Sequence, residues 1–521
     1  MKKIILSVVL LIVLAMVSAG IWGYFAFLYT KPLNKAELAE LTPDWSVVTH
    51  NNWSPWFDPG DGTKEWNPAA SFNAWLATVP EEEKAWPILV ELKYAYSDLI
   101  EDDASGAFPE EGEDWIRLIN SINSAENVGV IEQIQKAYSK PVMGCGLYFT
   151  TDPYEHDAMM RHGVEDDDWD PNFSLDLDLL NVLIPALRLH MRTSKILSSY
   201  SPHLLLEGDT DGCIDLIESI MDSSELSLEF PVLIGQLVSA AIKSNGQSVI
   251  VWALENHSDQ FTDEQLERLD QILERHQQID ASWQGEALWF HDILRRVSSA
   301  DGKLLFSKAN RWGSAFAEGD AFTDLPTHVP DAQLHASLQR PMYLYGKALS
   351  LMEAQCALPW DDSLISSYEY LESNFGSVNY ATELIINLMM PATGKFAARV
   401  RQYEQVAIAN RLLITVYRHR LEHGAFPESF EQIDERFLTF EPIDAFNGQR
   451  LSYILTEYGP VIYSVGDNRV DDQGEPMWKV AKENTLRVPD WHSSSEAESL
   501  LDPDRPLIGG DWVLYPKPND D

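Results

Sequence analysis

The chain has 521 residues, enough for more than one domain, and 45% of them are hydrophobic, an ordinary share for a folded protein. Its 81 Asp and Glu residues outnumber its 38 Lys and Arg residues, which gives a formal net charge of −43. Proteins that bind nucleic acid use lysine and arginine to displace counterions, so this charge argues against such a function. The three cysteines are too few for a disulfide framework and are expected either as buried small side chains or with one pair joined outside the cytoplasm. They are Cys145, Cys213 and Cys356.

The N-terminus carries a long apolar run. Residues 1–3 are predicted to form a short cytoplasmic tail, and residues 4–29 contain no charged side chain. A helix of that length spans a hydrocarbon core of about 30 Å, so we predict a single-pass anchor in the inner (cytoplasmic) membrane. The bulk of the chain is then expected to be extracytoplasmic. A cleaved signal peptide is the alternative, because Val17-Ser-Ala19 offers a small-residue cleavage site, but the apolar residues beyond it favour the anchor.

The middle of the chain is predicted to be mostly helical. Residues 30–80 are irregular and rich in tryptophan, and are expected to dock on the rest of the protein or to face a membrane interface or carbohydrate. Residues 81–399 are predicted to form an α-helical body, an irregular solenoid or bundle, because its helices follow no fixed period. Asp209 and Thr262 are expected to begin helices. Helical periodicity recurs over residues 81–100, 113–122, 128–138, 179–199, 212–221, 232–244, 247–256, 263–277, 283–297, 342–357 and 364–374.

Residues 400–521 are predicted to form a small α+β domain. A helix beginning at Arg401 is expected to end at Gly424, with Arg411 and Arg418 largely outside its apolar face. We expect a fragment that starts near Met390 to fold alone, since about 130 residues bury an adequate core.

Shorter elements follow this helix. Ser429 and Gln432 have the spacing of a capping box, which predicts a second, short helix with Phe430, Ile433 and Phe437 inward. Residues 451–455 and 461–465 predict a β-hairpin, and residues 512–515 are a third β-prone run.

An acidic loop follows the predicted hairpin. Carboxylate and carbonyl oxygens in a flexible loop favour Ca²⁺ over zinc or Mg²⁺, so the sequence predicts a structural Ca²⁺ site. Asp511, directly before the third β-prone run, is expected to join it. The predicted ligands are Asp467, Asn468, Asp471, Asp472 and Asp511. The alternative is a solvated acidic loop, which is also the expectation for the dense acidic patch at residues 165–178, with cation binding as the other reading of that patch.

The order of these C-terminal parts resembles the C-terminal half of the major pseudopilin of type II secretion. Together with residues 204–220 and 230–242, it also resembles a group of large uncharacterised bacterial envelope proteins with a helical body. The resemblance implies a pseudopilin-like fold and a structural Ca²⁺ in the acidic loop, and it implies no known activity. The chain departs from the pseudopilin pattern at Asn468 and Arg469, where Asp then Gly is usual, and in its lack of a prepilin signal. The matching residues are Glu422-His-Gly424, Phe426-Pro427, Asp444, Phe446, Gly448, Tyr463-Ser-Val-Gly466 and Asp471-Asp472.

No sequence motif identifies an enzyme. The chain has no phosphate-binding glycine loop and no Gly-x-Ser-x-Gly nucleophile elbow. His419 and His423 lie four residues apart and are expected to cap a helix end; a zinc site is the alternative if a third ligand converges. The sequence therefore predicts a membrane-anchored, extracytoplasmic scaffold or interaction protein that binds a protein partner. An accessory component of a type II secretion or pilus-like machine and an envelope hydrolase are the alternatives.

The predicted topology is testable with reporter fusions. A periplasm-only reporter fused after Asp521 should be active, and a cytoplasm-only reporter at the same position should be silent. The fusion protein should also stay in the membrane fraction during a high-salt wash. Activity of the cytoplasmic reporter, or release of the protein by salt, would contradict the predicted anchor and its orientation.

Overall fold

The computed structural model describes residues 34–40, 68–102, 104–146, 185–279, 283–288, 290, 339–356, 367–374, 391–466, 470–474, 478–480, 487–489 and 512–515. Helices make up 67% of these residues, which confirms a mainly α fold with a small sheet. Among the described helices, none has the length and apolar character needed to cross a membrane. The predicted anchor at 4–29 and the acidic patch at 165–178 lie outside the described residues.

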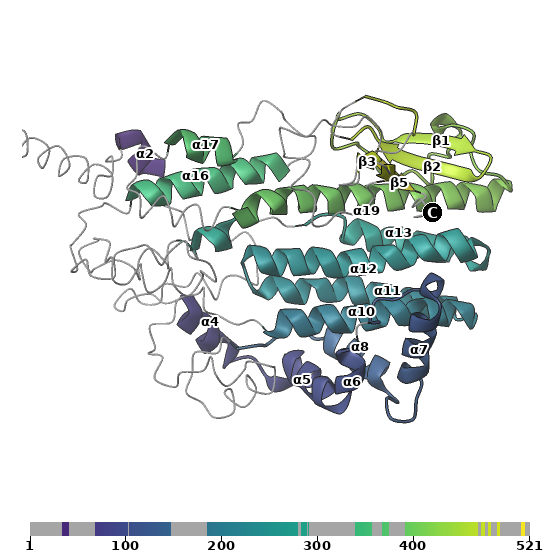
Figure 1. The fold of residues 1–521 in the computed structure, drawn as a ribbon, viewed down its shortest axis with the longest axis horizontal. Helices are drawn as coiled ribbons and strands as arrows, with labels where there is room; N and C mark the ends of the chain where they lie inside the picture. Colours follow the sequence, from purple (N-terminus) through teal and green to yellow (C-terminus); the bar gives the residue numbers. More distant parts are fainter. Residues whose placement is uncertain are drawn as a thin grey trace, which may run out of the picture.

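Long helices form a stack that the shorter elements flank. Figure 1 shows α10 to α13 and α19 side by side, with α5 to α8 on one side of the stack and a sheet on the other. The helices are α2 (Lys35–Glu40), α4 (Pro68–Leu76), α5 (Trp86–Ala95), α6 (Ser97–Ile100), α7 (Glu113–Ile122), α8 (Val130–Tyr138), α10 (Pro185–Leu206), α11 (Thr210–Ser223), α12 (Leu233–His257), α13 (Asp263–Arg275), α16 (Gln339–Cys356), α17 (Ser367–Asn374) and α19 (Pro391–His423).

Two apolar cores lie along this stack. One is enclosed by α4 to α8 and the facing side of α10, with Leu89, Leu118 and Ile134 fully buried. The other is enclosed by α11, α12, α13, α19 and the sheet. Because α10, α11 and α12 contribute side chains to both cores, these three helices join the two ends of the described stack. Cys145 and Cys213 are buried and are not joined to each other by a disulfide, which is consistent with small core side chains.

The sequence predicted several helix boundaries correctly. The predicted helix 113–122 coincides with α7, and the Thr262 side chain caps α13 in a capping box with Gln265. Asp209 accepts a hydrogen bond from the Gly212 backbone and caps α11. One prediction was wrong: 232–244 and 247–256 are not two helices but the single helix α12. The cause is Gly246, which is a packing position rather than a break, because a Cβ there would lie 2.6 Å from Met221 Cγ.

The C-terminal part is a long helix under an antiparallel sheet. The helix α19 begins at Pro391, ahead of the predicted Arg401, and ends at His423, directly before Gly424, which has φ +77°. The strands β1 (Ser452–Thr456), β2 (Gly459–Ser464) and β5 (Trp512–Tyr515) form a sheet in the order β1-β2-β5, and β3 (Trp478–Val480) pairs with β4 (Arg487–Pro489). The hairpin prediction and the third β-prone run are therefore confirmed.

The predicted second helix is wrong. Only a single 3₁₀ turn forms at Phe430–Gln432, and the Ser429 side chain caps nothing. Gln432 instead accepts a hydrogen bond at 2.8 Å from the Glu428 backbone, so the two halves of the expected capping box do not meet. Ile433 and Phe437 are buried as predicted, because the segment packs flat against α19 without coiling further.

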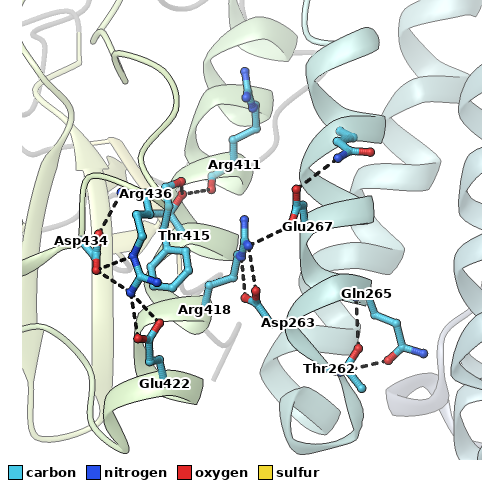
Figure 2. Close-up of polar contacts among 12 residues, drawn as sticks. Thr262, Asp263, Gln265, Glu267, Arg411, Thr415, Arg418, Glu422, Asp434 and Arg436 are labelled. Atoms are coloured by element: carbon cyan, nitrogen blue, oxygen red, sulfur yellow. Dashed lines mark hydrogen bonds and ion pairs between the residues drawn. The ribbon is translucent and has the colours of Figure 1, made fainter.

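Two arginines of α19 join that helix to α13. Arg411 makes two hydrogen bonds to the Asp270 carboxylate, at 2.8 and 3.3 Å. Arg418 makes the same fork to Asp263, at 2.7 and 2.9 Å, and reaches Glu267 at 3.2 Å (Figure 2). The Arg418 hydrogen bonds hold the pKa of Asp263 below its usual range. Both arginines are buried, at 2% and 8% exposure, which corrects the expectation that they lie outside the buried face.

Aromatic rings cover the other side of these guanidinium groups. The Arg411 guanidinium lies 4.1 Å from the Phe440 ring centroid, and that of Arg418 lies 4.8 Å from the Phe437 ring centroid. Both rings come from the segment between α19 and the sheet. Each arginine therefore bridges the helical body on one side and the C-terminal segment on the other.

A second ladder of polar contacts joins α11 to α13. Arg268 bonds both Asp215 and Glu218, while His276 contacts Asp222 at 2.7 Å. Gln265 continues the ladder by donating to Asp211 at 2.6 Å. Since the acidic residues at 211, 215, 218 and 222 share one face of α11, the contacts run along the whole helix. The helix α13 is thus bonded through one face to α11 and through another to α19.

The core crosses the predicted domain boundary at residues 399/400. That boundary falls inside α19, and Leu412, Leu413 and Val416 of this helix belong to the same apolar cluster as Leu269 and Ile272 of α13. A fragment starting near Met390 would expose these side chains together with Arg411 and Arg418. Independent folding of such a fragment stays a prediction from the sequence.

The α13–α19 contacts should matter for stability. Arg411→Met leaves the Asp270 carboxylate buried without its partner, so we expect the free energy of unfolding to fall by about 3–5 kcal/mol. Arg420→Met is the matched control, because Arg420 lies on the same helix but is exposed. Chemical denaturation of both variants measures the difference. Equal, small effects of the two substitutions would contradict a structural role for the Arg411 pair.

Candidate functional site

The predicted calcium ligands are only partly within the described residues. Asp467, Asn468 and Asp511 lie outside them, whereas Asp471 and Asp472 lie inside. The last residue of β2, Ser464, pairs with Trp512, the first residue of β5. The end of β2 that leads into the acidic loop therefore lies opposite the start of β5, the arrangement on which the predicted site depends.

The Asp471 carboxylate already has protein partners. One oxygen, Oδ1, accepts hydrogen bonds from the Tyr463 hydroxyl at 3.1 Å and from the Gln473 backbone at 2.9 Å. These bonds orient the exposed carboxylate at the base of the loop. Within the described ranges, no three His, Cys, Asp or Glu side chains converge in a way that would hold a metal ion. The calcium site stays a prediction from the sequence.

A buried carboxylate, Asp444, fixes the end of β2 beside this loop. Asp444 is 1% exposed and accepts hydrogen bonds at 2.9 Å from the backbones of Phe446 and Val465 and from the Ser464 hydroxyl. Burial raises the pKa of Asp444, and these hydrogen bonds counter part of that rise. The same turn bonds α19 through Gln405, whose side-chain oxygen accepts from the Ala445 backbone at 2.6 Å. Asp444 thus has a structural role, which is to hold the turn after it against the end of β2.

The two histidines near the end of α19 do not form a zinc site in the described part of the chain. Their rings are 4.3 Å apart, centroid to centroid, but no third ligand converges on His419 and His423 there. Burial lowers the pKa of His419, and the neighbouring His423 lowers it further. Asp434 and Glu422, the nearby acids, are both bonded to Arg436 (Figure 2).

A buried polar group surrounds His190 in the first core. Its ring nitrogens lie 2.9 Å from the Ser227 hydroxyl and 3.0 Å from the Ser223 hydroxyl, and Tyr138 packs edge-on against the ring at 5.0 Å. Complete burial lowers the pKa of His190 to about 3, so the ring is neutral. The combination of serine and histidine suggests hydrolysis, but the group is enclosed on all sides by α8, α10 and α11. Its hydrogen bonds satisfy buried polar atoms, which is a structural role.

Two glutamates of the helical body, Glu229 and Glu286, are also buried. Desolvation raises the pKa of Glu229 to about 8, against hydrogen bonds from the backbones of Gly144 and Met143. It raises that of Glu286 to about 7, against a hydrogen bond from the Leu233 backbone. A raised folded-state pKa means that each group stabilises the fold below its unfolded pKa and loses that contribution as pH rises through its folded value. Neither carboxyl lines the cavity described next, so we assign them no catalytic part.

A cavity of about 450 Å³ opens between three segments of the helical body. Its walls are the loop of residues 104–108 with the start of α7, one face of α10 and one face of α12. Polar side chains dominate the lining, among them Glu111, Lys195, Ser198 and Ser248. The sequence analysis did not find this cavity, because its residues are far apart in the chain and belong to no motif.

Comparison of the chain with protein-family models, with characterised proteins and with solved structures finds no match.

The calcium prediction has a direct test on the full-length protein. If Ca²⁺ binds only the folded loop, it should stabilise the protein by about 2.7 kcal/mol at a hundredfold excess over its dissociation constant. Asp471→Asn keeps the hydrogen-bond acceptor for Tyr463 but removes the charge, and Asp511→Ala removes a predicted ligand, so each should abolish most of the gain. Asp167→Ala, in the other acidic patch, should leave it intact. Thermal midpoints that are equal in millimolar Ca²⁺ and in chelator would contradict the site.

Proposed function

We propose that this chain is a membrane-anchored, extracytoplasmic scaffold that binds a protein partner on its helical surface. The observation that carries the proposal is the position of three arginine side chains in a chain that has few cations. Arg268, Arg411 and Arg418 join three helices in ladders of ion pairs instead of gathering around a reaction site. Bracing of this kind holds long helices in fixed positions, which a protein that presents a surface requires.

The surface offers apolar side chains for such a partner. Ile116 on α7 and Ile234 at the start of α12 are 53% and 50% exposed. Single exposed apolar residues are normal, so these two mark positions to probe rather than a defined interface. The uncharged run at 4–29 supports the membrane anchor, and the charge of −43 argues against nucleic acid as the partner.

A second candidate is an accessory component of a type II secretion or pilus-like machine. A specific feature favours it: a long helix packs under an antiparallel sheet. Several residues that match the pseudopilin pattern lie in the turns between these elements. Gly424 and Gly448 have positive φ of +77° and +69°, which glycine adopts without strain, and Asp444 binds the end of β2. In this alternative the partner meets the sheet, where Tyr458 at the hairpin tip is 93% exposed.

Site-specific photo-crosslinking in cells separates these functions. A crosslinking amino acid replaces Ile116, Ile234 or Tyr458 in turn in the full-length protein, and the crosslinked products are identified. A single adduct from Ile116 or Ile234 that exceeds the background is expected for the scaffold. Adducts only from Tyr458, to secretion or pilus proteins, would favour the second candidate instead.

An envelope hydrolase remains the competing class. No adduct from any of the three positions, together with turnover of an envelope polymer by the purified protein, would overturn both interaction proposals. The matched control places the crosslinker at Ile414, which is fully buried in α19 and should yield no adduct.

A further inference from the structure

The cavity between α7, α10 and α12 contains an unpaired cation. Arg117, which also lines this cavity, bonds Asp102 and Asp114. Lys195 lines the cavity, yet its ammonium has no hydrogen bond and no ion pair to any described residue.

The stem of Lys195 is held in place by the loop above it. Gly106 has φ +100°, a conformation that favours glycine, and a Cβ there would make an ordinary van der Waals contact with Lys195 Cδ at 3.5 Å. The Gly106 backbone also donates a hydrogen bond at 2.9 Å to the Ser199 hydroxyl of α10, which fixes the loop on that helix. Glycine adopts this backbone conformation without strain, and the loop then contacts the apolar stem of Lys195, a residue that lines the cavity.

Two serine hydroxyls of the lining offer hydrogen-bond acceptors to the cavity. The Ser198 hydroxyl donates to the Lys195 carbonyl at 2.8 Å, and the Ser248 hydroxyl donates to the Ser244 carbonyl at 3.0 Å. Because each hydroxyl hydrogen is used within its own helix, the oxygens present only lone pairs to the cavity. Glu111 adds a carboxylate that is not paired with any described cation.

This pattern has a chemical complement. A ligand that satisfies it carries one anionic group for Lys195 and, close by, a cationic or strongly donating group for Glu111 and the serine oxygens. We propose that the cavity binds a small zwitterion of the amino-acid class, with its carboxylate on Lys195 and its ammonium toward Glu111. The cavity volume of about 450 Å³ admits an amino acid or a short peptide. The proposal is independent of the scaffold function and does not require a membrane anchor or a partner.

Three probes of similar size test the charge pattern. L-alanine has both charged groups, propionate lacks the ammonium, and ethylamine lacks the carboxylate. Titration calorimetry of the full-length protein in detergent should show millimolar or tighter binding of L-alanine, and binding weaker by at least about tenfold for each of the other two. If propionate binds as tightly as L-alanine, the proposal that the ligand is a zwitterion is wrong. If L-alanine does not bind at all, the proposal of a binding site is wrong.

Variants test the residues. Lys195→Met keeps the stem but removes the charge, so we expect L-alanine affinity to fall by about tenfold or more, and Lys195→Arg should restore much of it. Glu111→Gln should weaken the binding of L-alanine but leave the binding of propionate unchanged. Lys136→Met is the matched control, because Lys136 is an exposed lysine of α8 outside the cavity lining. This variant should bind L-alanine as tightly as the unmodified protein does. Equal L-alanine affinity in the Lys195→Met and Lys136→Met variants, with both folded by circular dichroism, would contradict the assignment.

Discussion

The contact between the arginines of α19 and the carboxylates of α13 is the interaction on which the described fold depends most. Arg411 and Arg418 lie two helical turns apart, and each is forked onto one carboxylate and covered by one ring. A buried guanidinium is costly unless every donor finds an acceptor, and here α13 supplies the acceptors along one face. Because the aromatic rings come from the segment after α19, the same two side chains also position the approach to the sheet.

This constraint explains how a chain of such high negative charge packs its helices. Several acids of α11 and α13 pair with a few arginines on the two sides of α13, and Asp270 is buried there. The apolar cluster then runs without interruption from α11 to the sheet, where Tyr417 of α19 meets Tyr515 of β5 through a 3.0 Å hydroxyl contact. Helical body and C-terminal segment therefore share one core, and the bracing gives the proposed scaffold its fixed surface.

Local patterns in the sequence predicted local structure well and long-range structure poorly. The helix start at Thr262 and the β1–β2 hairpin are determined by neighbouring residues, so both were predicted correctly. Gly246 looked like a helix break because nothing local reveals Met221 against it. Arg411 looked like a surface residue because its partners on α13 are more than a hundred residues away. The cavity around Lys195 was missed for the same reason, whereas the calcium loop was found by its local charge and awaits its test.

Native-state hydrogen exchange along a denaturant series tests the central claim, that α13, α19 and the sheet open as one unit. The account predicts that slowly exchanging amides of α13, α19 and β2 converge on a single opening free energy before global unfolding. Amides of α19 and β2 that stay protected at denaturant concentrations where α11 to α13 have lost their protection would show a separate C-terminal domain and contradict the account.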